Sequence, residues 1–413
     1  MSQLRQRYDQ LKAQNLSLNI ERGQPSDENF DLCNDMLNNI ISNNTLTPSG
    51  IELRNYPGGQ AGLKEARELF CTILGTKPEE TIVGNNSSLK LLANTLMWAL
   101  IRGLNTSATP WSSFNKPKAI VTVPGYDRHF TLLDALGFEM IAVNMTENGP
   151  DVSKIEALVK NDESVKCMVF VPTYSNPTGD TISDENVRRL AKMKTAASDF
   201  TIFADDAYVV HHLTDEKTRP LNLVTACKEA GNENRTYLFG STSKITFSGA
   251  GLGFMGSNES NTQYILKLMG VQSIGPNKME QYRHVLFINN YKDGIEGLMK
   301  DHAKILKPKF DAVQNVLNKE LGGTDLAKWT NPKGGYFVSL DTKYPVADKV
   351  VEHAKGLGLA LTPAGATFPF KKDPDNSNIR ISPTRPPAKE VEHAMEVLSL
   401  CIKIASEEYL SAH

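Results

Sequence analysis

A single lysine, Lys244, stands among small and hydroxylated side chains in the segment STSKITFSGAG at residues 241–251. A lysine that loses contact with water is deprotonated more readily and can attack a carbonyl carbon to form a Schiff base. The hydroxyl and backbone N–H groups of such a turn can hold an anion. The pattern therefore favours a ligand that carries both a carbonyl and an anionic group, although a lone lysine in such a loop is also typical of a solvated surface.

Pyridoxal phosphate carries an aldehyde and a phosphate, and three further residues offer groups for its ring. Asp205, at the end of the run FTIFADD, offers a carboxylate for a protonated pyridine nitrogen. Tyr208 in DDAY and Asn176 in SNPTG offer hydrogen bonds to the ring hydroxyl. Each also has an ordinary structural interpretation, because an Asp at a strand end often caps a helix and NPTG is a typical turn sequence. The combination favours a cofactor site more than any single residue does.

These residues follow short apolar runs that alternate with segments of helical length. The runs span residues 118–124, 166–172, 200–206 and 236–241. The alternation predicts parallel strands that crossover helices bury on both faces, so we expect an α/β fold. Ligands of such sheets bind at the carboxyl ends of the strands, and the polar residues that follow the runs should therefore share one rim.

The pattern of expected strands and helices divides the chain into three parts. Residues 47–300 carry the α/β alternation and form the expected large domain. Residues 301–413 open with a long helical pattern, continue through WTNPKGGYFVSL and NIRISPTRP, and predict a smaller α+β domain. Residues 1–46 are too few for a domain, and we expect this segment to pack with the small domain.

Composition favours small molecules as ligands. The chain has 45 Lys and Arg against 47 Asp and Glu, a formal net charge of -2 that gives no reason to expect nucleic acid or a membrane surface as a partner. Its five cysteines are scattered without metal-binding or disulfide spacing. Neither a signal peptide nor a run of about 18 apolar residues is present, so a cytoplasmic location is predicted.

Together, the motifs SNPTGD, ADDAYVV and STSK resemble those of the fold-type I pyridoxal-phosphate aminotransferases. The intervals of 29 residues from Asn176 to Asp205 and 39 residues from Asp205 to Lys244 are typical of that family. The stretches RNYPGGQAGL, PGYDRHF and SIGPNK most resemble a less common branch of aspartate aminotransferases that aligns with the pyridoxal domain of MocR-type proteins. The resemblance implies a mostly parallel, seven-stranded type of sheet flanked by helices, plus a smaller α+β domain.

The same resemblance implies roles around the cofactor ring. Lys244 would bind the cofactor covalently and, once substrate frees it, carry the proton between the substrate Cα and the cofactor. Asp205 would face the pyridine nitrogen, and Asn176 and Tyr208 would face the phenolic oxygen. Tyr126 in PGYD falls where the family stacks an aromatic ring on the pyridine, although an aromatic core residue is an equally good interpretation.

Phosphate binding is implied at the segment TIVGNNSSLKLL, which predicts a strand, a tight turn and a helix start. A helix N-terminus attracts anions, although a simple helix cap is the alternative. The implied donors are the backbone N–H groups of Asn85 and Asn86 and the hydroxyls of Ser87, Ser241 and Ser243. Tyr56 matches the tyrosine that the family extends to the phosphate of the neighbouring subunit, which implies a homodimer with shared active sites.

Substrate binding is implied at Arg380 in NIRISP, the position of the arginine that holds the α-carboxylate by a bidentate fork. On its own, an arginine on a late strand would be interpreted as a surface ion-pair partner. Gly23 in RGQP matches the glycine whose backbone approaches the same carboxylate.

One position departs from the family pattern. Its common form places an arginine eight residues after the lysine to bind the phosphate, and here that residue is Leu252. Lys278, Arg54 and Arg128 are the candidate cations for the phosphate and for a distal substrate carboxylate, with Lys278 the first choice.

Two other motifs carry less weight. Residues 251–256 fit GxGxxG but do not lie in the first strand-to-helix turn of a dinucleotide-binding unit. We expect these glycines to let the backbone pass close to the cofactor loop. His211 and His212 are adjacent and lack a matching metal-ligand pattern, so we expect structural roles for them.

The leading hypothesis is an aminotransferase that moves an amino group from an L-amino acid, aspartate first, to a 2-oxo acid, 2-oxoglutarate first, by a ping-pong mechanism. The alternatives are another pyridoxal-phosphate enzyme, such as a decarboxylase or lyase, and a non-catalytic ligand sensor. The sensor is less favoured because the 45 N-terminal residues are too few for a winged helix with a linker.

Overall fold

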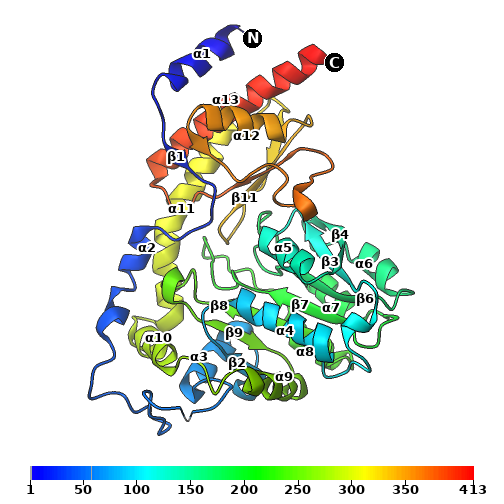
Figure 1. Cartoon of the computed structure of the whole chain (residues 1–413). Helices are drawn as coiled ribbons and strands as arrows, with labels where there is room; N and C mark the ends of the chain where they lie inside the picture. The colour runs from blue at the N-terminus through cyan, green and yellow to red at the C-terminus, as the bar shows by residue number, and fades with distance from the viewer. Residues whose placement is uncertain (1, 57) are drawn as a thin grey trace.

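The computed structural model describes residues 2–56 and 58–413. An eight-stranded sheet lies at the centre of the larger part of the molecule (Figure 1). Its order is β2 (Thr81–Val83), β9 (Gly253–Gly256), β8 (Thr236–Ser241), β7 (Thr201–Asp205), β6 (Val165–Phe170), β3 (Lys118–Val123), β4 (Glu139–Thr146) and β5 (Gly149–Pro150). Strands β8, β7, β6, β3 and β4 run parallel, whereas β9 and β5 pair with antiparallel neighbours. The predicted α/β class is confirmed, and the strand beyond the seven expected is the two-residue β5.

Side chains alternate across this sheet between two buried clusters. On β7, Ile202 and Ala204 pack in one cluster, and Phe203 packs in the other. Helices α3 (Lys64–Leu74), α6 (Val152–Val159), α7 (Asp184–Lys192), α8 (Leu223–Glu229) and α10 (Lys278–Asn290) cover the first face. Helices α4 (Ser88–Arg102), α5 (Asp127–Ala135) and α9 (Glu259–Gln272) cover the second. Burial on both faces explains why the strands are continuous apolar runs in the sequence.

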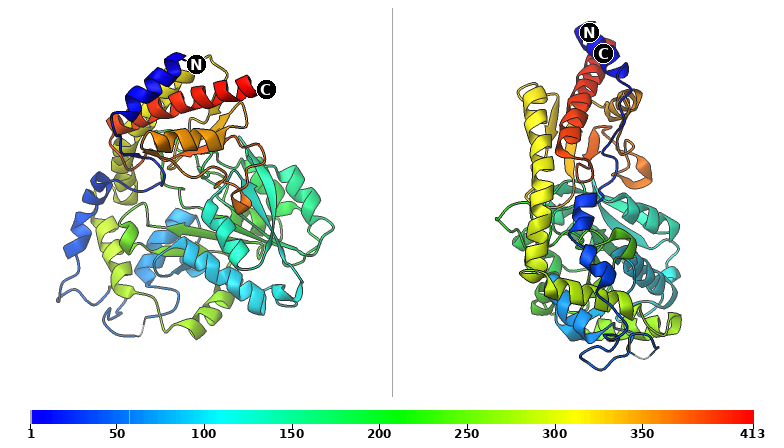
Figure 2. Two further views of the ribbon diagram at one scale, coloured as in Figure 1. Left: turned by 45° about the horizontal axis from the view of Figure 1, so that its top comes forward. Right: turned by 90° about the vertical axis from the view of Figure 1, so that its left-hand side faces the viewer.

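The C-terminal part is built on an antiparallel three-stranded sheet. Its order is β10 (Ala327–Trp329), β11 (Val338–Thr342) and β13 (Asn378–Ile381). Helices α11 (Gly294–Leu321), α12 (Ala347–Gly356) and α13 (Ala388–Ala412) pack with it in a third buried cluster. Figure 2 shows that α11 runs beside both parts of the molecule.

The N-terminal segment also contacts both parts. Helix α1 (Ser2–Lys12) lies against α13, and β1 (Leu18–Asn19) pairs with β12 (Leu359–Ala360) of the C-terminal part. After α2 (Asp27–Asp31), however, Cys33 and Met36 pack in a cluster of the large sheet. The expected boundary at residue 300 falls inside α11, so the domain bounds remain a prediction. Among the described residues, no helix is both long and apolar enough to cross a membrane.

Candidate active site

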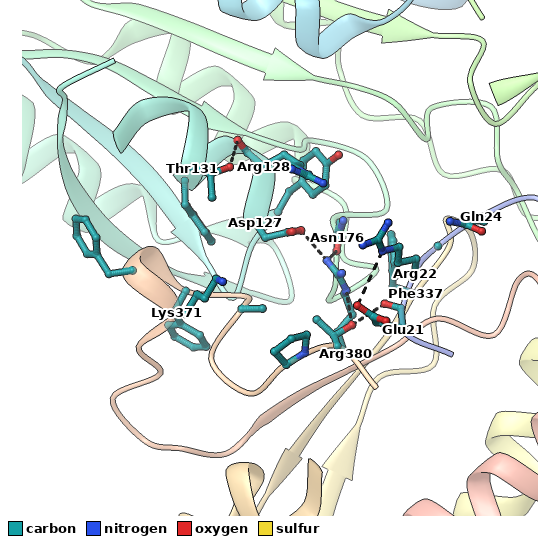
Figure 3. A pocket seen from close by; sticks show the side chains of 18 of the residues that line it. Glu21, Arg22, Gln24, Asp127, Arg128, Thr131, Asn176, Phe337, Lys371 and Arg380 are labelled. Atoms are coloured by element: carbon teal, nitrogen blue, oxygen red, sulfur yellow. Dashed lines mark hydrogen bonds and ion pairs between the residues drawn. The ribbon is translucent and has the colours of Figure 1, made fainter. Parts of the chain in front are cut away.

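Two cavities meet at Lys244. The smaller has a volume of about 150 Å³ and the larger, shown in Figure 3, about 650 Å³. Tyr126, Asn176, Tyr208 and Lys244 line both of them. These residues follow the carboxyl ends of β3, β6, β7 and β8 respectively. The strand pattern predicted a shared rim at this edge of the sheet. The two cavities therefore share these four side chains.

Lys244 lies three residues beyond β8, with its amine against aromatic faces. Its Nζ is 5.6 Å from the ring centre of Tyr208 and 5.8 Å from that of Tyr336. Burial lowers the pKa of the Lys244 amine, and nearby Arg380 lowers it further, while Asp205 acts in the opposite direction. A larger fraction of the amine is therefore neutral at a given pH, which is the form that attacks a carbonyl carbon.

The backbone around Lys244 is held by neighbouring side chains. His211 Nε2 donates to the carbonyl oxygen of Lys244 at 3.3 Å, and the Ser241 and Ser243 hydroxyls lie 2.6 Å apart. Burial lowers the pKa of His211 to about 3, so its ring is neutral at ordinary pH. The adjacent His212 faces Tyr174, whose hydroxyl is 2.7 Å from its Nδ1. Both histidines therefore make structural contacts.

Asp205 ends β7 at the floor of the smaller cavity. Its Oδ2 is 3.0 Å from Nε2 of His129, a buried residue of α5. Its Oδ1 is buried and has no hydrogen-bond partner among the described residues. The sequence analysis did not single out His129, because the rotation of α5 that brings it to Asp205 leaves no signal in the sequence. The free oxygen is suited to a cationic N–H donor in the cavity.

Arg380 on β13 faces the larger cavity with 7% of its side chain exposed (Figure 3). Its Nε donates to Thr362 Oγ1 at 3.3 Å, and its Nη1 donates to Asp127 Oδ1 at 3.1 Å and to Asn176 Oδ1 at 3.4 Å. The guanidinium also lies 5.1 Å from the ring centre of Phe337. A buried guanidinium held in this way can bind an incoming carboxylate.

Gly23 also lines the larger cavity. A Cβ atom there would lie 2.4 Å from Cζ of Phe337. The absence of a side chain thus lets the backbone pass beside this ring.

Only some of the residues expected to bind phosphate line the smaller cavity. Ser87, Ser241 and Ser243 line the smaller cavity, together with Ser88, which the sequence analysis did not single out. The Ser87 hydroxyl accepts the backbone N–H of Lys90 at 3.4 Å and so caps α4, which was the alternative considered.

Asn85 and Asn86 are exposed and line neither cavity. Asn85 instead accepts hydrogen bonds from the backbone N–H groups of Gly253 and Asn277. Phosphate roles for these residues stay a prediction.

Three other expected residues lie away from the cavities within the described chain. Tyr56 is 75% exposed, and Arg54 pairs with Glu52 at 2.9 Å on the surface. Lys278 is buried and donates to the backbone oxygen of Asn55. Any contact of Tyr56, Arg54 or Lys278 with a bound ligand stays a prediction.

The cations that line the larger cavity differ in part from the three candidates named in the sequence analysis. Arg128, one of the three candidates, lines it, and so do Arg22 and Lys371. Arg22 has Glu21 as a neighbour, with 3.9 Å between the charged groups. Lys371 follows Phe370 in a turn where both residues have positive φ angles, 56° and 57° respectively. Arg22 could have been found from its place beside Gly23, whereas no spacing signal marked Lys371.

A family model described as aspartate amino-transferase matches residues 1–413. The chain belongs to this family. It is 43% identical over 411 residues to a putative aminotransferase of Mycolicibacterium smegmatis, covering 99% of this chain and 96% of that one. It is 41% identical over 406 residues to an aspartate aminotransferase of Corynebacterium glutamicum, covering 98% and 93% of the two chains.

The crystal structure of an aspartate transaminase from Corynebacterium glutamicum superposes with a TM-score of 0.96 at 40% identity, covering 99% of this chain and 96% of that one. Together these findings confirm the predicted fold-type I aminotransferase family. The protein is an aminotransferase, an enzyme that acts on small molecules. The finer resemblance to the branch aligned with MocR-type proteins stays a prediction.

Proposed function

We propose that this aminotransferase uses pyridoxal 5'-phosphate to move the amino group of L-aspartate to 2-oxoglutarate by a ping-pong mechanism. The observation that carries the proposal is the position of Lys244, where a cavity with an unpaired carboxylate oxygen meets a cavity with a buried arginine. Full-length relatives named aspartate aminotransferase support the choice of substrate.

The residues of the smaller cavity fit the cofactor. The unpaired Oδ1 of Asp205 suits a protonated pyridine nitrogen, and the serine hydroxyls beside the N-terminus of α4 suit a phosphate. Tyr126 offers a ring face, and Asn176 and Tyr208 offer polar groups for a ring oxygen. When bound there, the cofactor supplies an electron sink for the bond that breaks at the substrate Cα.

The chain's own groups then supply attachment, orientation and proton transfer. Lys244, whose pKa burial lowers, would be the nucleophile for the aldehyde and afterwards hold the proton removed from the substrate Cα. Burial raises the pKa of Tyr208 well above its usual value, so its hydroxyl stays a hydrogen-bond donor. Arg380 fixes the α-carboxylate and thereby the direction of the bond that breaks.

A dicarboxylic substrate fits the charges of the larger cavity. Arg380 accounts for one carboxylate, and Arg22, Arg128 and Lys371 line the same cavity as cations for a second. Arg128 has no ion pair among the described residues, which leaves its charge available to a ligand. A substrate with a second carboxylate would therefore be held at both ends.

The homodimer is part of the proposal. Tyr56, Val271 and Ile274 expose 75%, 78% and 66% of their surface. They belong to adjoining segments, because the side chain of Gln60 donates to the backbone of Ser273 and Lys278 donates to that of Asn55. An apolar patch of this kind suits a second copy of the chain and would present Tyr56 to its active site.

The test is the visible absorption spectrum of the cofactor-loaded protein with L-aspartate alone. We expect the absorption band of the lysine-bound cofactor to disappear and to return when 2-oxoglutarate is added, with oxaloacetate and glutamate as products. A band that ignores aspartate would contradict the substrate, and carbon dioxide as a product would favour a decarboxylase. Sedimentation velocity of the same sample tests the assembly, and a monomer at micromolar concentration would contradict the dimer.

A further inference from the structure

The arginine expected to bind the substrate already has a carboxylate partner. Asp127 Oδ1 lies 3.1 Å from Nη1 of Arg380, and Figure 3 shows the two side chains directed at each other across the larger cavity. Asp127 is the first residue of α5 on the large sheet, whereas Arg380 lies on β13 of the three-stranded sheet. The ion pair therefore connects the two parts of the molecule at the site itself.

The guanidinium of Arg380 donates to three acceptors, of which one is charged. Thr362 accepts from Nε, and both Asp127 and Asn176 accept from Nη1. A carboxylate binds a guanidinium bidentately through two neighbouring nitrogens, so it needs Nη2 together with Nη1 or Nε. Asp127 is the charged acceptor on Nη1, so it competes directly for the Nη1–Nη2 edge, whereas the acceptor on Nε is the neutral Thr362. Two carboxylates that share one guanidinium also repel each other.

We propose that Asp127 is a built-in competitor that holds the place of the substrate α-carboxylate and gives it up when substrate binds. The inference rests on the proposed function, in which Arg380 binds that carboxylate. Without a ligand, Asp127 neutralises a guanidinium that is 7% exposed, and an unpaired buried charge would be costly. With a ligand, the substrate takes over that neutralising role.

Both partners are placed for such an exchange. The Asp127 side chain is 35% exposed and lies in the first turn of α5, where the helix dipole favours a negative charge without Arg380. Arg380 keeps its orientation through Thr362, Asn176 and the ring of Phe337. The exchange therefore changes the partner of the guanidinium but not its position.

This arrangement has a consequence for substrate selection. A ligand with a carboxylate can replace Asp127, whereas an amine without one leaves the Asp127 pair in place and gains nothing from Arg380. Asp127 thus favours amino acids over simple amines and reduces the affinity for every carboxylate ligand. The removal of its charge should tighten carboxylate binding by roughly tenfold, given the Coulomb energy of two charges at the edge of a protein cavity.

The experiment is a calorimetric titration of the cofactor-loaded protein with succinate, a dicarboxylate that lacks an amino group. We expect Asp127→Asn to bind succinate roughly tenfold more tightly than the unaltered protein, because the variant keeps an acceptor for Arg380 but loses the competing charge. The matched control is Asp134→Asn, which removes a charge from the same helix and cavity without touching Arg380. We expect its affinity to change by less than about threefold.

A second readout separates competition from a structural role. The KM of Asp127→Asn for aspartate should fall with little change in kcat, whereas simple loss of structure would lower kcat and the melting temperature. Asp127→Ser serves the same purpose if the Asn variant does not fold. Unchanged or weaker succinate binding by the folded variant would overturn the inference. If Arg380→Ala leaves succinate affinity unchanged, the α-carboxylate assignment in the proposed function fails instead.

Discussion

At the scale of single residues, the reactivity expected of Lys244 comes from its surroundings. Burial lowers the pKa of its amine, which lies beside the rings of Tyr208 and Tyr336. Asp205 is the group that acts in the opposite direction. The lysine is therefore suited to attack when neutral and to carry a proton afterwards.

Replacement of Lys244 by alanine tests both roles. Lys244→Ala should reduce turnover by at least about a thousandfold, because nucleophile and proton carrier are lost together. The free energy of unfolding should change by less than about 1 kcal/mol, since the side chain lines a cavity. Steady-state kinetics and urea unfolding measure the two quantities. Ser248→Ala, an exposed position in the same segment, is the control, and a Lys244 variant as active as this control contradicts the assignment.

Residue types and spacing were enough to name several of the polar groups that line the two cavities. Lys244, Asp205, Tyr208, Asn176 and Arg380 were expected together, and the structure gathers them there. Three of the residues that were not singled out depend on local chain geometry. The rotation of α5 about its axis directs His129 and Asp127 to the site. Lys371 lines the site because of an irregular turn. Neither the rotation of a helix about its axis nor the path of a loop follows from residue types in one sequence.

At the scale of elements, Gly253 lets β9 approach the start of α4. A Cβ atom on Gly253 would lie 2.4 Å from the backbone carbon and oxygen of Ser87, and the Gly253 N–H donates to Asn85 at 2.9 Å. This is the glycine-rich segment 251–256, and the contact agrees with the expectation of close backbone approach rather than a dinucleotide site. The position of the α4 N-terminus at the smaller cavity thus depends on a missing side chain.

A methyl group at Gly253 should therefore harm both stability and cofactor binding. Gly253→Ala must move backbone atoms apart, which typically costs about 1 to 3 kcal/mol of folding free energy. It should also weaken retention of pyridoxal phosphate, since α4 carries Ser87 and Ser88. Gly249→Ala is the matched control, because a Cβ atom there meets nothing within 4 Å. Urea unfolding and cofactor release on dialysis are the measurements, and equal behaviour of the two variants contradicts the role.

Elements were predictable where burial left a clear pattern. The four apolar runs correspond to β3, β6, β7 and β8 within two residues at each end, because these strands are buried on both faces. Strands β1 and β12 have two residues each and are too short to show any periodicity. The long helix was expected at 301–321, but α11 begins at Gly294 and carries its first turns against the large sheet.

At the scale of the whole molecule, assembly was the hardest property to predict from the sequence itself. Val271 and Ile274 are ordinary apolar residues in the sequence, and their exposure becomes known only when the chain is folded. The homodimer was inferred from the match of Tyr56 to a family position. The exposed patch around Tyr56 now gives a physical reason for the same proposal.

Three buried histidines brace the loop that carries Lys244. His211 donates to the carbonyl oxygen of Lys244, and His302 donates to that of Ile245 at 2.9 Å while its other nitrogen faces Asn29. His284 accepts from the hydroxyl of Thr246 at 2.8 Å. Burial lowers the pKa of His211 to about 3 and those of His284 and His302 to about 4. All three are neutral in the folded protein at ordinary pH, and protonation of His284 would remove the acceptor that Thr246 uses.

The protein should therefore lose stability in mild acid. Below a pH of about 6.5 the unfolded chain protonates these histidines but the folded chain does not, so their contribution is present above that pH and is lost as pH falls. Burial raises the pKa of Asp206 to about 7, so below that pH the folded chain takes up one proton that the unfolded chain does not. This uptake stabilises the fold as pH falls and offsets the effect of about one of the three histidines. The remaining two protons correspond to at most about 3 kcal/mol per pH unit between pH 6 and 5.

Urea unfolding at pH 7.5, 6.5 and 5.5 measures this dependence, and His284→Gln provides the comparison. Glutamine keeps an amide that can hydrogen-bond to Thr246 but cannot take up a proton, so the variant should lose roughly 1.4 kcal/mol per pH unit from the slope. A lower free energy of unfolding at pH 7.5 does not affect this test, because proton uptake is measured by the slope of that free energy against pH. A stability that stays constant or rises as pH falls would show that the three histidines are not neutral in the fold. In that case His211 and His302 could still donate to the carbonyl oxygens of Lys244 and Ile245, whereas Thr246 would lose its acceptor.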